Sequence, residues 1–139
     1  MIIVLYINIV SANQQPITMR KPEIIKHKGA DIIYLDFTNM KEQHEILRLE
    51  DEGAELIQKQ KFNSALTLTN MDGMFFNNDI RNHFSRVVKE NSPFVKAGAV
   101  IGLNGLISIM YKSFIALTGR NIKLFKTKEE ALDYLAGFK

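Results

Sequence analysis

The sequence predicts an α/β fold, with a mixed and mostly parallel sheet that carries an N-terminal antiparallel hairpin and about four helices. In the second half of the chain, the apolar strand Phe94 to Ile101 leads into a helix over Leu103 to Thr118 and then into a second strand, Asn121 to Phe125. Parallel strands require a crossover of this kind, usually a helix. In the first half, β-rich runs over Glu23 to His27 and Asp31 to Phe37 are separated by a short gap with a glycine, which predicts a hairpin.

A helix is expected over Lys41 to Lys61, where the apolar period changes from two residues to a helical one. Gly53 falls on the apolar face of this helix. A glycine in mid-helix costs up to about 1 kcal/mol relative to alanine, so we expect close approach of the helix to the sheet as its compensation. The apolar face also contains Ile46, Leu49, Leu56 and Ile57.

The middle and the end of the chain add a strand and two capped helices. Ser64 to Thr69 alternates as a strand does, and Asn77 or Asn78 is a suitable N-cap for the helix that follows. At the end of the chain, Thr127 and Glu130 have the spacing of a capping box, in which the two side chains reciprocally satisfy amides at the helix start. The apolar stripe of the middle helix consists of Ile80, Phe84, Val87 and Val88.

The first residues suggest an extension to a single domain. Met1 to Val10 is apolar but has no basic segment before it, so we expect a strand in preference to a signal peptide. Ala97 to Tyr111 is uncharged but shorter than the ~20 apolar residues that cross a bilayer, so no transmembrane segment is expected. We therefore predict an N-terminal strand extension over residues 1–20 and one domain over residues 21–139.

Composition excludes several function classes. The chain has no cysteine, so disulfides and Cys-bearing zinc, haem or redox motifs are excluded, and a cytoplasmic location without cofactors is the expectation. The net charge of +3 is modest, and basic residues are interspersed with acidic ones, so nucleic-acid binding is not expected. The histidines, His27, His44 and His83, lack metal-ligand spacing, and no metal is predicted.

Four segments carry a resemblance to a known family. These are Ile32 to Phe37 (IIYLDF), Leu66 to Gly73 (LTLTNMDG), Asn91 to Leu106 (NSPFVKAGAVIGLNGL) and Gly119 to Leu135 (GRNIKLFKTKEEALDYL). Together they resemble the SpoIIAA-like proteins of the STAS superfamily, which are small bacterial domains, mostly of unassigned function. The resemblance implies a mixed sheet with helices packed on it, as in anti-sigma-factor antagonists and, more distantly, CRAL-TRIO lipid-transfer domains. It implies a regulatory or ligand-binding module in preference to an enzyme.

One departure from the family bears on regulation. In anti-sigma-factor antagonists the helix after the central strand begins at a serine that is phosphorylated, whereas the matching region here reads GMFFNN over Gly73 to Asn78. No hydroxyl occupies the place, although Thr69 lies nearby in the sequence. A phosphorylation switch of that type is therefore not expected.

The candidate site lies where the parallel strands end, because ligands of open α/β sheets usually bind beyond the carboxyl ends of the strands. Gly102 and Gly105 lead into a helix whose exposed amides suit a phosphate or carboxylate; the alternative is a tight turn that Asn104 caps. Asp36 and Asp72 are either paired carboxylates for the acid–base chemistry of a hydrolase or for a divalent ion, or, more commonly, turn-stabilising side chains. The candidate ligand-binding residues are Asp36, Thr38, Asn70, Asp72, Gly73, Phe75, Phe76, Gly102, Asn104 and Gly105, and no catalytic residue is assigned.

Aromatic and methionine side chains border this region. Phe75 and Phe76, with Met71 and Met74, form either an apolar mouth for a lipid or partner, or a plug over the core, and core packing is favoured. Ile109 and Tyr111 lie off the apolar stripe of their helix and are candidates for a homodimer contact. The sequence thus leaves three functions open: a module that binds a small apolar or anionic ligand or a protein partner, a structural homo-oligomer, and a hydrolase using Asp36 and Asp72.

Overall fold

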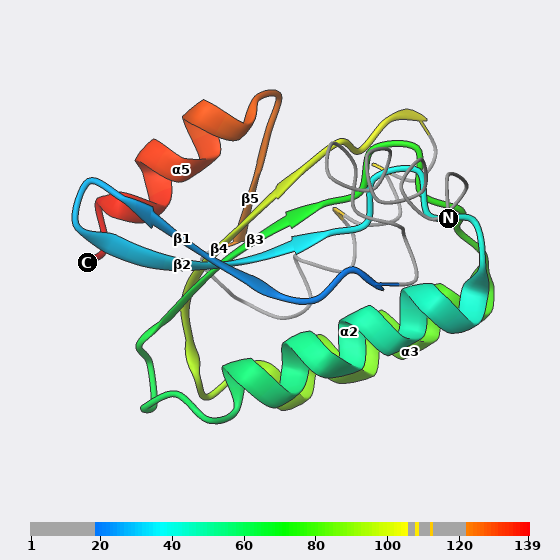
Figure 1. Cartoon of the computed structure of the whole chain (residues 1–139), viewed down its shortest axis with the longest axis horizontal. Coiled ribbons are helices and arrows are strands. Elements are labelled where there is room, and N and C mark those ends of the chain that lie inside the picture. The colour runs from blue at the N-terminus through cyan, green and yellow to red at the C-terminus, as the bar shows by residue number, and fades with distance from the viewer. Residues whose placement is uncertain (1–18, 106–107, 109–111, 113–121) are drawn as a thin grey trace, which may run out of the picture.

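A computed structural model describes residues 19–105, 108, 112 and 122–139 of the chain. In this part of the molecule, five strands form one sheet and three helices pack against it (Figure 1). The strands are β1 Glu23–His27, β2 Ala30–Asp36, β3 Ala65–Asn70, β4 Val95–Ile101 and β5 Ile122–Phe125, and the helices are α2 Gln43–Ile57, α3 Asn78–Asn91 and α5 Lys128–Ala136.

The sheet confirms the predicted mixed topology. The strands lie side by side in chain order, with β1 and β2 antiparallel and the other neighbours parallel. His27 pairs with Ala30, so the hairpin turn consists of Lys28 and Gly29. Both turn residues have positive φ angles, 49° and 83°, as in the turns whose twist matches that of antiparallel strands.

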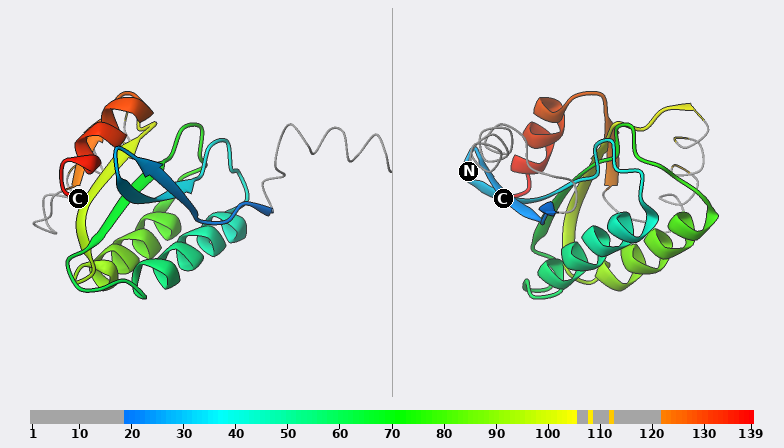
Figure 2. Two further views of the ribbon diagram at one scale, coloured as in Figure 1. Left: turned by 60° about the vertical axis from the view of Figure 1, so that its left-hand side comes forward. Right: turned by 45° about the vertical axis from the view of Figure 1, so that its right-hand side comes forward.

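The helices form two layers on opposite faces of the sheet. The helices α2 and α3 lie side by side on one face, and α5 covers the other (Figures 1 and 2). Each of α2 and α3 joins two adjacent parallel strands. Because such crossovers share one hand, consecutive crossovers that add strands in the same direction place their helices on the same face.

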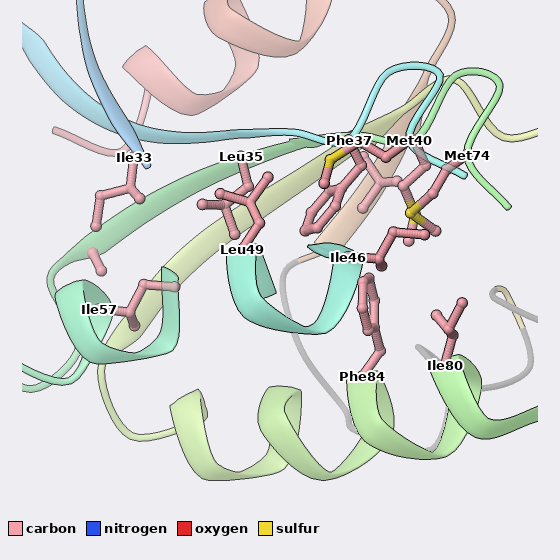
Figure 3. Close-up of a cluster of buried hydrophobic side chains, with 13 residues drawn as sticks. Ile33, Leu35, Phe37, Met40, Ile46, Leu49, Ile57, Met74, Ile80 and Phe84 are labelled. Atoms are coloured by element: carbon pink, nitrogen blue, oxygen red, sulfur yellow. The ribbon is translucent and has the colours of Figure 1, made fainter. Parts of the chain in front are cut away.

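The two faces of β2 supply the two halves of the core. Ile33 and Leu35 face α2 and α3, whereas Ile32 and Tyr34 face α5. Figure 3 shows Leu35 beside Leu49 of α2, with Phe37 near Phe84 of α3, and the Phe37 and Phe84 ring centroids are 5.4 Å apart. A strand whose successive side chains point to opposite faces can pack apolar residues on both only if both faces are covered.

The close helix-to-sheet approach expected at Gly53 is present. A Cβ atom at Gly53 would lie 2.6 Å from Cδ1 of Leu35, a residue of the core that is 3% exposed. The small residue therefore lets α2 lie directly on the sheet, and Ile46 and Leu49 on the same stripe are fully buried.

Both predicted N-caps are in place. Asn77 is the N-cap of α3, where its Oδ1 accepts a hydrogen bond from the Ile80 amide at 2.9 Å and its Nδ2 donates to Gln43 Oε1 at 2.7 Å. Thr127 caps α5 by accepting from the Glu130 amide at 3.2 Å. In a capping box the Glu130 carboxylate would accept a hydrogen bond from the main-chain amide of Thr127. Here it accepts from the Thr127 hydroxyl at 3.1 Å.

We expect Asn77→Ala to lower the free energy of unfolding by about 1 kcal/mol, because it removes the acceptor that satisfies the Ile80 amide. Asn77→Asp keeps an acceptor at the same place and is the matched control, although it loses the bond to Gln43. Urea denaturation of both variants measures the difference. Equal stability of the two would contradict the capping role.

Parts of the prediction lie outside the described residues. The expected strand over residues 1–10 and most of the expected helix over residues 103–118 fall there, so three of the four predicted helices can be compared. None of the helices in the described ranges combines the length and the apolar character that a bilayer crossing requires.

Candidate functional site

The turns that follow β2, β3 and β4 are joined to one another at one edge of the sheet. Main-chain hydrogen bonds connect each turn to the next along the sheet. They run from the Phe37 amide to the Asn70 carbonyl (2.8 Å), from Asn39 to Asp72 (2.8 Å) and from Met71 to Ile101 (2.9 Å). The structure therefore brings together the segments around Asp36, Asp72 and Gly102, as expected for strand carboxyl ends.

Two glycines allow these turns to come so close. Gly102 has a φ of +82°, and a Cβ atom there would lie 2.3 Å from the main-chain nitrogen of Asp72. Gly73 has a φ of +68°, and a Cβ atom there would lie 2.2 Å from Oδ1 of Asn39. Gly102 therefore requires glycine for two reasons, its left-handed backbone and its contact with the main chain of Asp72. Gly73 requires it mainly for the left-handed backbone, because the Asn39 side chain can move.

A pocket of about 160 Å³ lies between these turns, and we call it the rim pocket. The Lys41 ammonium donates a hydrogen bond to the Gly73 carbonyl oxygen and so places a positive charge on the pocket wall. The residues that line the pocket are Lys41, Met71, Gly73, Met74, Gly102 and Asn104. Gly73, Gly102 and Asn104 are predicted site residues, whereas the sequence indicates Lys41 only as the start of a helix.

Asp36 and Thr38 do not line the rim pocket. The Asp36 carboxylate accepts a hydrogen bond from the Thr38 amide at 3.0 Å and another from the Thr38 hydroxyl. The guanidinium of Arg20 donates to the carbonyl oxygens of Asp36 and Thr38 at 3.2 and 2.6 Å. These contacts give Asp36 the turn-stabilising role that the sequence left as the alternative to acid–base chemistry.

Asn70 and Asp72 are connected in a similar turn. Oδ1 of Asn70 accepts from the Asp72 amide at 3.1 Å, and Nδ2 of Asn70 donates to the hydroxyl of Tyr34 at 3.2 Å. Asn70 thus links the turn to the sheet face beneath α5. The Asp72 residue is exposed beside the rim pocket.

The two phenylalanines after Gly73 differ in environment. Phe76 is partly buried and packs against the core together with the buried Met71 and Met74, as core packing predicted. Phe75 is 43% exposed.

Gly105 is also exposed, and no atom of the described residues lies within 4 Å of a Cβ atom placed there. Ile109 and Tyr111, the predicted homodimer contacts, lie outside the described residues.

One residue that sequence reasoning missed is Glu50. It is 5% exposed on the buried side of α2, and burial raises the pKa of its carboxyl to about 8, with a further contribution from the negative charge of Asp51. Its position four residues after Ile46 and four before Ala54 places it on the apolar stripe. An acidic residue on the apolar stripe of a helix is the pattern in the sequence that indicates a buried carboxyl group.

Glu50 lines a second, smaller cavity of about 50 Å³ between the helices and the sheet, which we call the Glu50 cavity. Thr67 and Thr69 of β3 and Asn91 of α3 add polar groups to its otherwise mainly apolar wall. Thr69, the hydroxyl that lies in the sequence near the Gly73 to Asn78 segment, is therefore on the inner face of the sheet. Among the described residues, the Glu50 cavity and the rim pocket share no lining residue.

A third group of side chains lies where the β1–β2 hairpin meets α5. One ligand atom each of His27, Glu129 and Asp133 lies within 4.8 Å of the others. The ammonium of Lys28 lies 2.8 Å from Asp133 Oδ1, and this hydrogen bond is the largest cause of a lowered pKa of Asp133. Lysine therefore already supplies a positive charge there, and the prediction that the protein holds no metal stays a prediction.

Comparison with known proteins identifies the fold. No family model and no curated protein matches the sequence. A solved structure described as an anti-sigma-factor antagonist (STAS) domain protein from Planctomyces limnophilus is similar, with a TM-score of 0.57 and 14% sequence identity. The match covers 84% of this chain and 99% of that one. At 14% identity the likeness establishes the fold alone. It confirms the resemblance to STAS domains as far as the fold is concerned.

Proposed function

We propose that this chain, which has the fold of a STAS domain, is a non-catalytic regulatory module that binds an anionic small molecule at the rim pocket. The observation that carries the proposal is the convergence of three turns around a pocket with Lys41 on its wall. Within the described residues, the side chains that line the rim pocket include no carboxylate and no histidine. The pocket is therefore suited to holding an anion and lacks the usual acid–base groups.

The geometry favours a phosphate or carboxylate group over a purely apolar ligand. The Lys41 ammonium offers charge-assisted hydrogen bonds, and the side-chain amide of Asn104 adds a neutral donor. The thioether side chains of Met71 and Met74 form the apolar part of the wall. An anion carrying an apolar or aromatic portion is consequently the class of ligand that we expect.

We expect Lys41→Gln to weaken binding of such an anion about tenfold. This corresponds to about 1.4 kcal/mol of binding free energy, which is what a partly exposed charge-assisted hydrogen bond contributes. Titration of the full chain with inorganic phosphate, ATP and vesicles of anionic phospholipid, followed by amide chemical shifts, separates a free phosphate from a nucleotide and a lipid headgroup. Lys59→Gln is the control, because Lys59 is exposed near the other end of α2.

Shifts centred on Gly73 and Gly102 that saturate in the wild type and weaken in Lys41→Gln support the proposal. Absence of saturable binding to all three probes counts against the anion site, as does an equal effect of the two lysine substitutions.

A protein partner is the second candidate, and the exposed Phe75 beside the rim pocket favours it. Large exposed aromatic side chains are common anchors of protein interfaces. Phe75→Ser should abolish capture of such a partner, whereas Phe62→Ser should not, because Phe62 is 75% exposed but lies in the loop between α2 and β3. Light scattering of the same samples distinguishes a separate partner from self-association into a homodimer. A cytoplasmic location and the hydrolase alternative with Asp36 and Asp72 stay predictions.

A further inference from the structure

The Glu50 cavity is lined by a carboxyl group whose residue is 5% exposed, and the carboxyl oxygens remain accessible. Within the described part of the chain, no hydrogen bond or ion pair reaches the Glu50 carboxyl, although the side chain is more than nine-tenths buried. Burying an unpaired ionised carboxylate costs several kcal/mol of free energy. Such a group therefore either stays protonated or binds a cation. The wall of the cavity shows what else such a cation would contact.

The described surroundings of Glu50 supply acceptors and apolar area but no positive charge. Thr67 and Thr69 of β3 line the cavity and carry hydroxyl groups that can accept. Asn91 lines it from α3, but its Oδ1 already accepts a hydrogen bond from Nε2 of Gln58 at 3.0 Å. Asp51 is the one described ionised group that acts on the Glu50 carboxyl, and its own partner is Nε2 of His83 on α3 at 2.7 Å. The apolar part of the wall comes mainly from Leu35, Ile57, Phe84, Val88, Val95 and Ile122.

We propose that the Glu50 cavity is a binding site for a small organic cation, a primary ammonium group with a short apolar tail. The three N–H bonds of an ammonium group match the carboxylate of Glu50 together with the threonine hydroxyls, and the apolar wall takes the tail. None of these residues belongs to the rim pocket, so this site is independent of the anion site proposed above.

The volume limits the length of the tail. A cavity of about 50 Å³ has room for roughly three to five water-sized groups, since a single water requires about 10–15 Å³ on the same measure. Propylammonium, a propyl chain on one nitrogen, is of this size. A longer amine must displace side chains of the wall and should bind less well.

The protonation of Glu50 sets the pH dependence of binding. Its carboxyl has a pKa of about 8 in the unliganded protein, so most molecules carry a neutral Glu50 at pH 6 and an ionised one at pH 9. Propylammonium remains charged over this range, as a lysine side chain does. Its affinity should therefore fall about tenfold for each pH unit below 8.

The test is titration of the full chain with propylammonium at pH 6 and pH 9, followed by amide chemical shifts, with 1-propanol as a neutral probe of similar size. We expect saturable shifts at Thr67, Gly98 and Asn91 at pH 9, at least tenfold weaker binding at pH 6, and weaker binding of propanol at pH 9. Glu50→Gln should reduce binding at pH 9 at least tenfold, and Glu55→Gln, a change at an exposed carboxylate of the same helix, should leave it unchanged.

Three results would overturn the proposal. They are the absence of saturable shifts at pH 9 in the wild type, equal affinity of wild type and Glu50→Gln, and equal affinity for propylammonium and propanol. Glu50→Gln introduces a neutral side chain of the same shape, so we expect the variant to fold. Its amide chemical shifts before the titration verify this. A longer probe, hexylammonium, separates binding in the cavity from general surface attraction of a cation, since only the cavity discriminates by length.

Discussion

The substitution Gly102→Ala is expected to lower the free energy of unfolding by about 2–5 kcal/mol. The added methyl group would lie 2.3 Å from the main-chain nitrogen of Asp72 and 2.7 Å from its Cα atom, so a backbone segment must move to admit it. Such overpacking costs about 1–3 kcal/mol. The left-handed φ of +82° adds about 1–2 kcal/mol for a residue with a Cβ atom.

Gly105→Ala is the matched control, because Gly105 also has a positive φ, +48°, but no atom of the described residues lies within 4 Å of the place that its methyl group would take. Only the conformational cost of the left-handed backbone, about 1–2 kcal/mol, then applies. Thermal and urea denaturation of both variants measure the difference. If Gly102→Ala is no less stable than Gly105→Ala, the turns after β3 and β4 are not in contact, and the rim pocket does not exist as described.

The second large effect concerns Glu50 and pH. The carboxyl has a pKa of about 8 in the folded protein and the ordinary value of 4.5 when the chain is unfolded. Between these values the unfolded state ionises while the folded state keeps its proton, so the contribution of Glu50 to stability is fully present below pH 4.5 and is lost as the pH rises toward 8. Each pH unit in this window costs about 1.4 kcal/mol, for a total of about 4 kcal/mol at pH 8.

Glu50→Gln removes this ionisation. We therefore expect the variant to match the wild type near pH 4.5 and to be more stable by a few kcal/mol at pH 8. Urea denaturation across the pH range measures the difference between the two proteins. Glu55→Gln, at an exposed carboxylate of the same helix, should show no such divergence. A constant difference between wild type and Glu50→Gln at every pH would show that the carboxyl is not buried in the folded state.

The elements were predictable because local signals and tertiary packing agree. The hairpin turn at Lys28 and Gly29, the cap at Asn77 and the stripe of α2 each depend on residues a few positions apart in the sequence. The crossover rule predicted that helices join the parallel strands and cover the sheet, whereas the order of the strands comes from the structure. Observed bounds differ from the predicted ones by a few residues, as at the helix predicted over Lys41 to Lys61 and found over Gln43–Ile57.

The site was predictable only as a region. The rule on strand carboxyl ends located Gly73, Gly102 and Asn104, but the contribution of Lys41 depends on a hydrogen bond to Gly73, 32 positions away in the chain. Asp36 satisfied the same rule and yet is engaged in its own turn, because sequence position alone does not reveal which way a side chain points. The Glu50 cavity depends on elements that meet only in the folded state.

The chain-order arrangement of the strands has a consequence for synthesis. Each strand from β2 to β5 pairs with the one that precedes it in the chain, so its partner has already left the ribosome when it emerges. Pairing of sequence neighbours keeps loop closure short, which favours rapid folding. The sheet can therefore grow strand by strand from its N-terminal edge during translation, without waiting for a distant segment to complete it.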